Sequence, residues 1–123
     1  MKISDILSDN STPKVHNNSS INEVIIEISQ KRLGAVAVLS NDRLEGIITD
    51  GDLRRMLEKE SSLDSLVAKD IMSVNPKTID ADSLAYDALE VMERNNISQM
   101  VVLSKSMYVG IIHIHDILKE GVL

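Results

Sequence analysis

Apolar residues between positions 20 and 31 recur at the spacing of a single helix face. They lie at i, i+3, i+4 and i+7 and predict a helix with one apolar side, at Ile21, Val24, Ile25 and Ile28. Ser19 or Ser20 is expected as the N-cap, and Ser20 with Glu23 three residues later fits a capping box at the helix start. Gly34 is the expected stop, because glycine commonly follows the last helical turn.

A strand, a turn, a second strand and a short helix are expected to follow this helix. The run 35–39 is apolar and partly β-branched, which predicts a strand. Asn41 and Asp42 favour a turn. Residues 44–49 then predict the second strand, and residues 50–58 predict a short helix.

The chain repeats this pattern when it is shifted by 64 residues. Gly46-Ile47-Ile48 falls on Gly110-Ile111-Ile112, and Asp52 falls on Asp116. An internal repeat of this kind predicts paired units that share a core. Because there are two copies only, a pseudo-twofold pair is expected rather than a solenoid.

The second copy predicts the same elements as the first. Its helix has apolar positions at Leu84, Ala88, Leu89 and Met92. Ser83 is expected as the N-cap of this helix, and the pair Asn95-Asn96 as its stop. Strands are expected at 100–103 and 108–113, and a last short helix at 114–119.

These elements predict an α/β (α+β) fold made of two small domains. Each domain is expected to hold a three-stranded sheet and two helices, in the order strand, helix, strand, turn, strand, helix. The short first strands are expected near Val15 and Ile79. We expect the domains to cover residues 1–62 and 63–123, to be linked by the polar segment 60–65, and to pack as a pseudo-twofold pair.

Composition and charge narrow the functions that such a pair can have. The 123 residues include 13 Lys and Arg against 19 Asp and Glu, a net charge of −6, so neither nucleic acid nor an anionic membrane is the expected partner. The chain has no Cys, which excludes disulfides, thiolate metal sites and a cysteine nucleophile. No apolar run is long enough to cross a bilayer, and the first residues do not resemble a signal peptide. A cytoplasmic protein is therefore expected.

The end of each copy carries a motif that resembles the CBS domain. Residues 46–53 and 110–117 fit the signature of that family, which is glycine, two apolar residues, threonine, two variable residues and aspartate, although His113 stands in the threonine place. The segment Asp70-Ile71-Met72, followed by Pro76, resembles the usual opening of a CBS domain. Over essentially its whole length the chain resembles a tandem CBS pair, also called a Bateman module.

A narrower resemblance links the chain to one group of enzymes. Residues 45–55 and 113–118 are similar to the C-terminal CBS pair of bacterial arabinose-5-phosphate isomerases. In that family an N-terminal sugar isomerase (SIS) domain carries the active site, and its product feeds the synthesis of Kdo for lipopolysaccharide or capsule. The resemblance implies that this chain is a non-catalytic regulatory part, with an SIS domain as partner in the full-length protein. It also implies a homodimer, because CBS pairs commonly associate face to face.

The first motif places groups that suit a phosphorylated sugar. Thr49 ends a strand where a helix begins, and free N–H groups at a helix start attract phosphate. The resemblance implies that Thr49 contacts phosphate and that Asp52 accepts hydrogen bonds from a ribose diol. Arg54 and Arg55 can add charged contacts to the phosphate. The alternative is ordinary capping, in which Asp50 and Asp52 stabilise the helix start and the arginines face solvent.

The second motif departs from the family pattern. His113 replaces the threonine and His115 replaces the equivalent of Gly51, whereas Asp116 is kept. His113 can still hydrogen-bond a phosphate, above all when it is protonated. The two halves are thus expected to hold one dominant site or two sites of different preference. The two imidazoles and the carboxylate also permit a metal site.

The remaining candidate ligand residues flank the two short first strands, at Lys14, Val15, Lys77 and Ile79. The two lysines can attract an anionic ligand or can simply face solvent. The resemblance implies an adenine nucleotide or a nucleotide sugar as ligand. CMP-Kdo is one such sugar, since feedback by the activated pathway product would be sensible. No catalytic residue and no resident cofactor are expected.

Three functions remain open at this point. The first is a regulatory module that senses a nucleotide or a CMP-sugar. The second is a structural dimerisation module that needs no ligand. The third is a metal sensor built on His113 and His115. The first two functions are compatible with each other.

Overall fold

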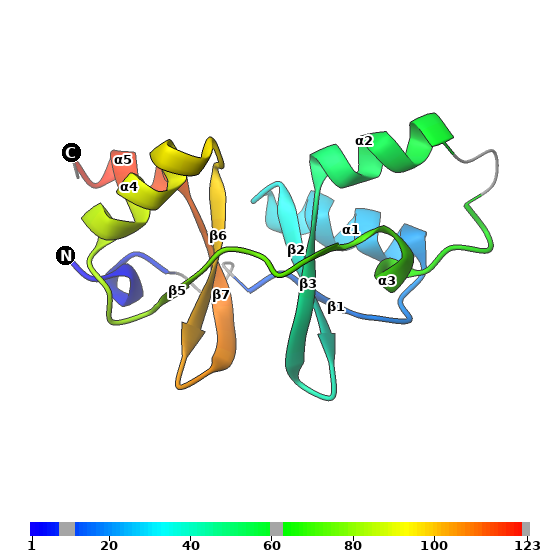
Figure 1. The fold of residues 1–123 in the computed structure, drawn as a ribbon, viewed down its shortest axis with the longest axis horizontal. Helices are drawn as coiled ribbons and strands as arrows, with labels where there is room; N and C mark the ends of the chain where they lie inside the picture. The colour runs from blue at the N-terminus through cyan, green and yellow to red at the C-terminus, as the bar shows by residue number, and fades with distance from the viewer. Residues whose placement is uncertain (8–11, 60–62, 122–123) are drawn as a thin grey trace.

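The computed structural model describes residues 1–7, 12–59 and 63–121. They form a mixed α+β fold of two halves that lie side by side (Figure 1). The first half contains β1 (Lys14–His16), α1 (Ile21–Lys31), β2 (Ala35–Ser40), β3 (Arg43–Thr49) and α2 (Asp50–Lys59). The second half contains β5 (Thr78–Asp80), α4 (Ala85–Asn95), β6 (Gln99–Ser104), β7 (Met107–His113) and α5 (Ile114–Lys119). The sequence did not predict three further short elements, which are η1 (Ile3–Asp5), α3 (Ala68–Ile71) and β4 (Ser73–Val74).

The two sheets have the same strand pairing. In the first half β1 runs parallel to β2 with Lys14 opposite Ala37, and in the second half β5 runs parallel to β6 with Thr78 opposite Val101. The hairpins β2–β3 and β6–β7 are antiparallel, and their registers shift at corresponding positions. The internal repeat predicted from the sequence is therefore confirmed in the strand registers.

Both hairpins close through two residues with positive φ, a backbone that matches the right-handed twist of a hairpin. Asn41 and Asp42 have φ of 51° and 64°, and Lys105 and Ser106 have φ of 52° and 66°. Asn and Asp tolerate this conformation better than most residues. The turn predicted at Asn41 and Asp42 is confirmed.

Helix α1 has the predicted N-cap, Ser20, while the bond that reaches the Glu23 carboxylate comes from the Ser20 hydroxyl at 3.3 Å and not from its amide, as a full capping box requires. The Glu23 amide donates a 3.2 Å hydrogen bond to the Ser20 hydroxyl, which is the N-cap. Its apolar face is narrower than the spacing suggested, because Ile25 lies at the edge of the stripe and is 38% exposed. The helix ends with Arg32 in the left-handed conformation, before the expected stop at Gly34.

The start of α4 differs from the prediction by one residue. Leu84, not Ser83, is the N-cap, and Leu84 is exposed while Ala85 takes the buried position. The cause is tertiary, because the N-terminal segment pairs here. The Ile3 amide donates to the Ser83 carbonyl, and the Ala85 amide donates to the carbonyl of Met1. This pairing holds Leu84 extended. The predicted stop is confirmed, since Asn96 is left-handed.

The two halves exchange short helical segments. Ile3 of η1 is fully buried in the core of the second half, with Ala85 and Met92 among its partners. Ala68 of α3 is fully buried in the core of the first half, which also contains Val24. Each core thus takes a helical turn from sequence adjacent to the opposite half, as Figure 1 shows for η1 and α3.

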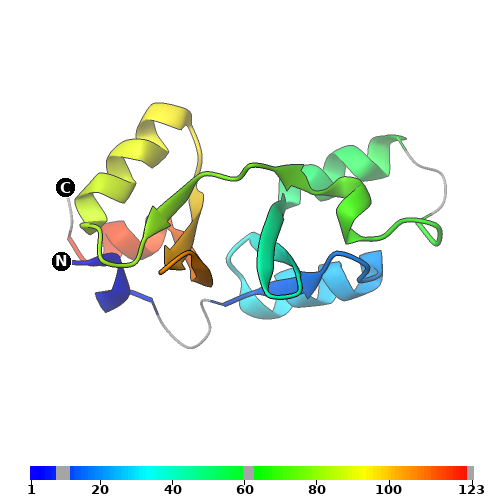
Figure 2. The same cartoon turned by 60° about the horizontal axis from the view of Figure 1, so that its bottom comes forward.

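Strand β4 extends the first sheet. It pairs antiparallel with β3, so this sheet has the order β1-β2-β3-β4, whereas the second sheet has the three predicted strands in the order β5-β6-β7. Gly46 permits this pairing, because a Cβ there would lie 2.6 Å from the Ser73 carbonyl oxygen. From β4 the chain crosses directly to β5 (Figure 2).

The halves contact each other through β7, which lies against both β2 and β3. The Gln99 side chain donates a 3.1 Å hydrogen bond to the Leu33 carbonyl. A Cβ at Gly34 would lie 2.8 Å from the Gln99 side-chain nitrogen, so the halves approach closely at this point. Within the described ranges, no helix is long and apolar enough to cross a membrane.

Candidate functional site

The two CBS-like motifs sit at equivalent turns from strand to helix. β3 ends at Thr49, and the Asp50 amide donates to the Gly34 carbonyl. β7 ends at His113, and the next amide, that of Ile114, donates to the Ser98 carbonyl. Gly34, which accepts from the Asp50 amide, closely approaches Gln99, the residue opposite His113, so these two strand ends lie at the junction of the halves.

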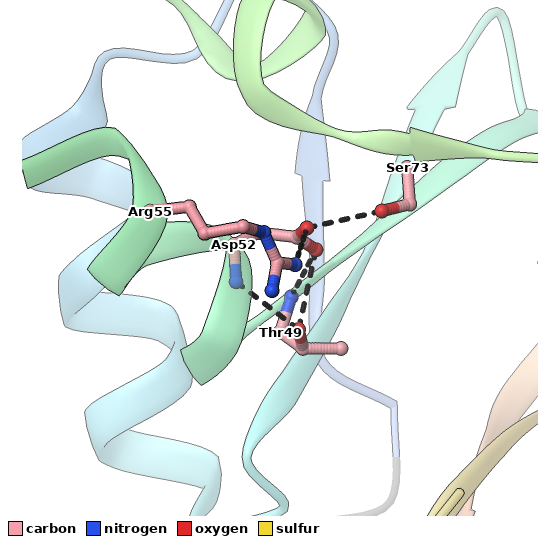
Figure 3. A network of polar contacts seen from close by, with 4 residues as sticks. All are labelled: Thr49, Asp52, Arg55 and Ser73. Carbon is pink, nitrogen blue, oxygen red and sulfur yellow. Dashed lines mark hydrogen bonds and ion pairs between the residues drawn. The ribbon is translucent and has the colours of Figure 1, made fainter. Parts of the chain in front are cut away.

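Asp52 is the centre of the polar network at the first motif (Figure 3). Its Oδ2 accepts hydrogen bonds from the Thr49 amide at 2.9 Å and from the Thr49 hydroxyl at 3.2 Å. Its Oδ1 accepts from Arg55 Nη2 at 2.6 Å and from the Ser73 hydroxyl at 3.0 Å. In return, the Asp52 amide donates to the Thr49 hydroxyl at 3.3 Å.

These contacts make Thr49 and Asp52 a reciprocal cap at the start of α2. The Asp52 side chain is only 6% exposed, whereas that of Arg55 is 56% exposed, so the guanidinium pairs with a buried carboxylate. The ordinary capping interpretation therefore describes the contacts of Asp52 in this structure. Asp52 and Arg55 also line a hollow of about 220 Å³ with Lys59 and Asp70, between α2 and α3.

The second motif forms a related cap with different chemistry. The His113 amide donates to Asp116 Oδ2 at 3.3 Å, and the His115 amide donates to His113 Nδ1 at 3.1 Å. The two imidazole rings stack with centroids 4.8 Å apart. Because Nδ1 of His113 accepts a hydrogen bond, the neutral ring carries its proton on Nε2.

The surroundings of His113 disfavour its charged form. Burial lowers the pKa of His113, and the neighbouring His115 lowers that pKa further, while Asp116 acts in the opposite direction. Among the residues that the structure describes, no three His, Asp or Glu side chains converge as a metal site would require. The recorded contact between the two histidines is that of a helix cap, because the His113 ring, at the N-cap of α5, accepts from the His115 amide.

The other candidate residues lie apart from these two motifs. Lys14 and Val15 line an open groove of about 620 Å³ between α1 and the β2–β3 turn. Ile79 packs against the core of the second half, and Lys77 lies just before β5. Arg54 is exposed on α2. The structure therefore brings together Thr49, Asp52 and Arg55, and separately His113, His115 and Asp116.

Sequence reasoning missed Ser73 and Tyr108. The Tyr108 hydroxyl donates a 2.6 Å hydrogen bond to the Pro13 carbonyl, across the junction of the halves. Its pKa is raised well above the ordinary value by burial and, secondly, by the Glu27 carboxylate. For Ser73 a signal does exist, since Asp70-Ile71-Met72-Ser73 repeats the pattern of Asp5-Ile6-Leu7-Ser8. Ser8 lies outside the described residues.

The sequence model of the CBS domain matches the chain twice, over residues 3–59 and 68–122. The chain belongs to the CBS domain family. It is a tandem CBS pair, as the two matching sheets and the repeated motifs indicated.

This CBS pair is similar to part of a curated enzyme. It is 38% identical to the arabinose 5-phosphate isomerase KdsD of Francisella tularensis over 121 residues, which cover 97% of this chain and 37% of that enzyme. The chain spans less than two fifths of the length of the first curated relatives it matches.

Solved structures share its fold. The CBS domain structure NE2398 has a TM-score of 0.88 and 18% identity and covers 100% of this chain and 98% of its own. The CBS domain protein PAE2072 of Pyrobaculum aerophilum, solved in complex with AMP, has a TM-score of 0.84 and 25% identity and covers 98% of this chain and 97% of its own.

Proposed function

We propose that this CBS pair is a regulatory module that binds an adenine nucleotide at the junction of its halves. The observation that carries the proposal is the pair of equivalent strand ends, Thr49 to Asp52 and His113 to Asp116, at that junction. The similarity to PAE2072, a protein solved with AMP, supports a nucleotide as the ligand.

Each group at the junction has a role in this proposal. In this proposal the Nε2 proton of His113 donates a hydrogen bond to a phosphate oxygen, and Thr49, whose hydroxyl donates to Asp52 Oδ2, holds that carboxylate in place. Asp52 and Asp116 are the acceptors for the ribose hydroxyls, as carboxylates with several acceptor positions. The exposed Arg54 supplies a further cation toward the phosphate.

Further candidates complete the proposed site. Lys14, the first residue of β1, and Lys77, which lies just before β5, are proposed to draw the anion in. Val15 and Ile79 supply apolar surface against which a base can lie. A structural role, that of holding the two strand ends in place, is proposed for Asp50, Arg55 and His115.

We further propose that the parent protein is an arabinose 5-phosphate isomerase. The support is the 38% identity to KdsD of Francisella tularensis, of which this chain covers 37%. The catalytic SIS domain would then lie in another part of the parent protein, and the reaction would serve Kdo and lipopolysaccharide synthesis in the cytoplasm. In this arrangement CMP-Kdo is the alternative ligand, as the activated product of the pathway.

A ligand panel tests the proposal. Thermal unfolding is followed with increasing AMP, CMP-Kdo or inorganic phosphate, because a ligand that binds only the folded state raises the melting temperature with its concentration. A concentration-dependent rise with AMP, larger than with phosphate, is expected. A rise in melting temperature with CMP-Kdo alone would identify a CMP-sugar, and not an adenine nucleotide, as the ligand. If all three leave the melting temperature unchanged, the ligand-binding function is refuted.

A second function, dimerisation, is favoured by exposed apolar side chains on the helices. Ile26 of α1 is 55% exposed and Leu57 of α2 is 61% exposed, and burial of such side chains drives association. We propose a homodimer through these helices. Sedimentation of the protein, with Ile26→Gln/Leu57→Gln as comparison, should show a dimer that the double variant loses. A monomer at micromolar concentration would contradict this second function.

A further inference from the structure

The carboxylate of Asp52 has no acceptor position left for a ligand. A carboxylate offers about four lone-pair sites for hydrogen bonds. Thr49 fills two of them at Oδ2, and Arg55 and Ser73 fill the other two at Oδ1. A ribose diol can therefore bind Asp52 only by displacing one of these groups.

Oδ1 is the carboxylate oxygen whose present hydrogen-bond partners a ligand can displace. Oδ2 is held by a backbone amide at 2.9 Å within the cap of α2, and losing it would expose the helix start. Oδ1 is held by side chains only. One belongs to Arg55, which is 56% exposed, and the other is the hydroxyl of Ser73, which can rotate to another acceptor.

Ser73 does not belong to the motif but to the segment that connects the halves. It lies on β4, where it pairs with Ile47, and from there the chain crosses to β5 of the second half. Figure 3 shows its hydroxyl pointing at the Asp52 carboxylate from the right of the view, whereas Thr49 lies below that carboxylate. Asp52 thus joins α2 and β3 to the connecting segment.

We propose that Ser73 is a positioning residue that competes with the ligand for Asp52. On this proposal, a bound diol donates its hydrogen bond to Oδ1 and displaces the Ser73 hydroxyl. Ligand binding in the first half then weakens the attachment of β4, and so alters the segment that connects the two halves. The inference rests on the proposed nucleotide-binding function and adds its regulation. It predicts that Ser73 lowers the affinity of the first half for nucleotide.

Variants of Ser73 test the competition, with AMP as the probe. Every protein compared, including the parent, carries Asp116→Asn, so that calorimetry measures AMP binding to the first half. Ser73→Ala should bind AMP about threefold to tenfold more tightly than the parent, the order expected when one competing hydrogen bond of typical net strength is removed. Ser73→Thr keeps the hydroxyl and should bind like the parent. Ser104→Ala, at the far end of β6, is the matched control and should also be neutral.

A second pair of variants distinguishes loss of the hydroxyl from a change in folding. Ser73→Val and Ser73→Thr have the same shape and differ in the hydroxyl, so Val should bind AMP more tightly than Thr by a similar factor. In NMR titrations with AMP, the amide signals of positions 73 and 74 should shift in the parent and should shift less in Ser73→Val. A merely structural role for Ser73 would leave this difference absent.

The outcomes separate the inference from the function on which it rests. If the parent binds AMP and removing the hydroxyl leaves the affinity unchanged or weaker, the competition is refuted and nucleotide binding stands. If neither these variants nor the protein with Asp116 intact binds AMP up to millimolar concentration, both are refuted.

Discussion

The Tyr108 hydroxyl of the second half donates a 2.6 Å hydrogen bond to the carbonyl oxygen of Pro13 in the first half. The two residues are 95 positions apart and belong to different copies of the repeat. Tyr108 is half-buried, and it belongs to β7, which lies against β2 and β3. The contact therefore fixes the start of β1 relative to the opposite half.

Tyr108→Phe is expected to lower the free energy of unfolding by about 1 kcal/mol, the usual contribution of one hydrogen bond in a partly buried site. Chemical denaturation measures the change from the transition midpoint at constant slope. Tyr86→Phe is the matched control, because Tyr86 is exposed on α4. Equal midpoints for the two variants would contradict a stabilising contact between the halves.

The raised pKa of Tyr108 predicts that the protein loses stability in alkali. Burial, and secondly Glu27, raise the pKa of Tyr108, so the folded protein keeps this proton where the unfolded chain has released it. The free energy of unfolding should then fall as the pH rises above about 10. In Tyr86→Phe the absorbance of tyrosinate reports Tyr108 alone, because the chain has two tyrosines. Titration of that tyrosine at its ordinary pKa in the folded state would refute this prediction.

The lowered pKa of His113 predicts that the protein loses stability in acid. Burial, followed by His115, lowers the pKa of His113 against the opposing effect of Asp116. The unfolded chain therefore binds a proton more readily, and the free energy of unfolding should fall as the pH drops below about 6.5.

A variant at His113 checks the prediction for acid. His113→Asn keeps an acceptor at the N-cap and removes the titrating ring. Its denaturation midpoint should depend less on pH between about 5 and 7 than that of the parent protein or of a His16→Asn control. The same slope in all three proteins would show that His113 does not carry the effect.

Gly46→Ala should be strongly destabilising because it blocks β4. Its Cβ would meet the Ser73 carbonyl at 2.6 Å, a backbone atom that cannot move aside cheaply. A cost of about 1–3 kcal/mol is expected, as for other overpacked sites. Gly51→Ala is the control, since its Cβ would first meet the flexible end of Arg55 at 3.3 Å and alanine favours a helix. Similar midpoints for the two variants would contradict the close approach of β4.

Much of the fold could be predicted because its elements are long enough to carry a period. The apolar stripe of α1, the β2–β3 hairpin and the shift of 64 residues all follow from patterns over at least six residues. α3 has four residues and β4 has two, so neither shows a period. The half against which each packs is decided by tertiary contacts, which local patterns do not contain.

The candidate site could be predicted only in part for the same reason. Thr49, Asp52 and Arg55 are neighbours in sequence and meet at the start of α2. Ser73 reaches Asp52 across 21 positions, through a strand that the sequence pattern does not reveal. Without Ser73, Asp52 looks available to a ligand, whereas the structure shows its acceptor positions in use.

The most direct test of the account is calorimetric titration of AMP into the parent protein and into Asp52→Asn/Asp116→Asn, with Asp87→Asn as an exposed control. The account predicts saturable heats for the parent and the control and their loss in the double variant. Equal heats in all three proteins would contradict a nucleotide site built on the two aspartates.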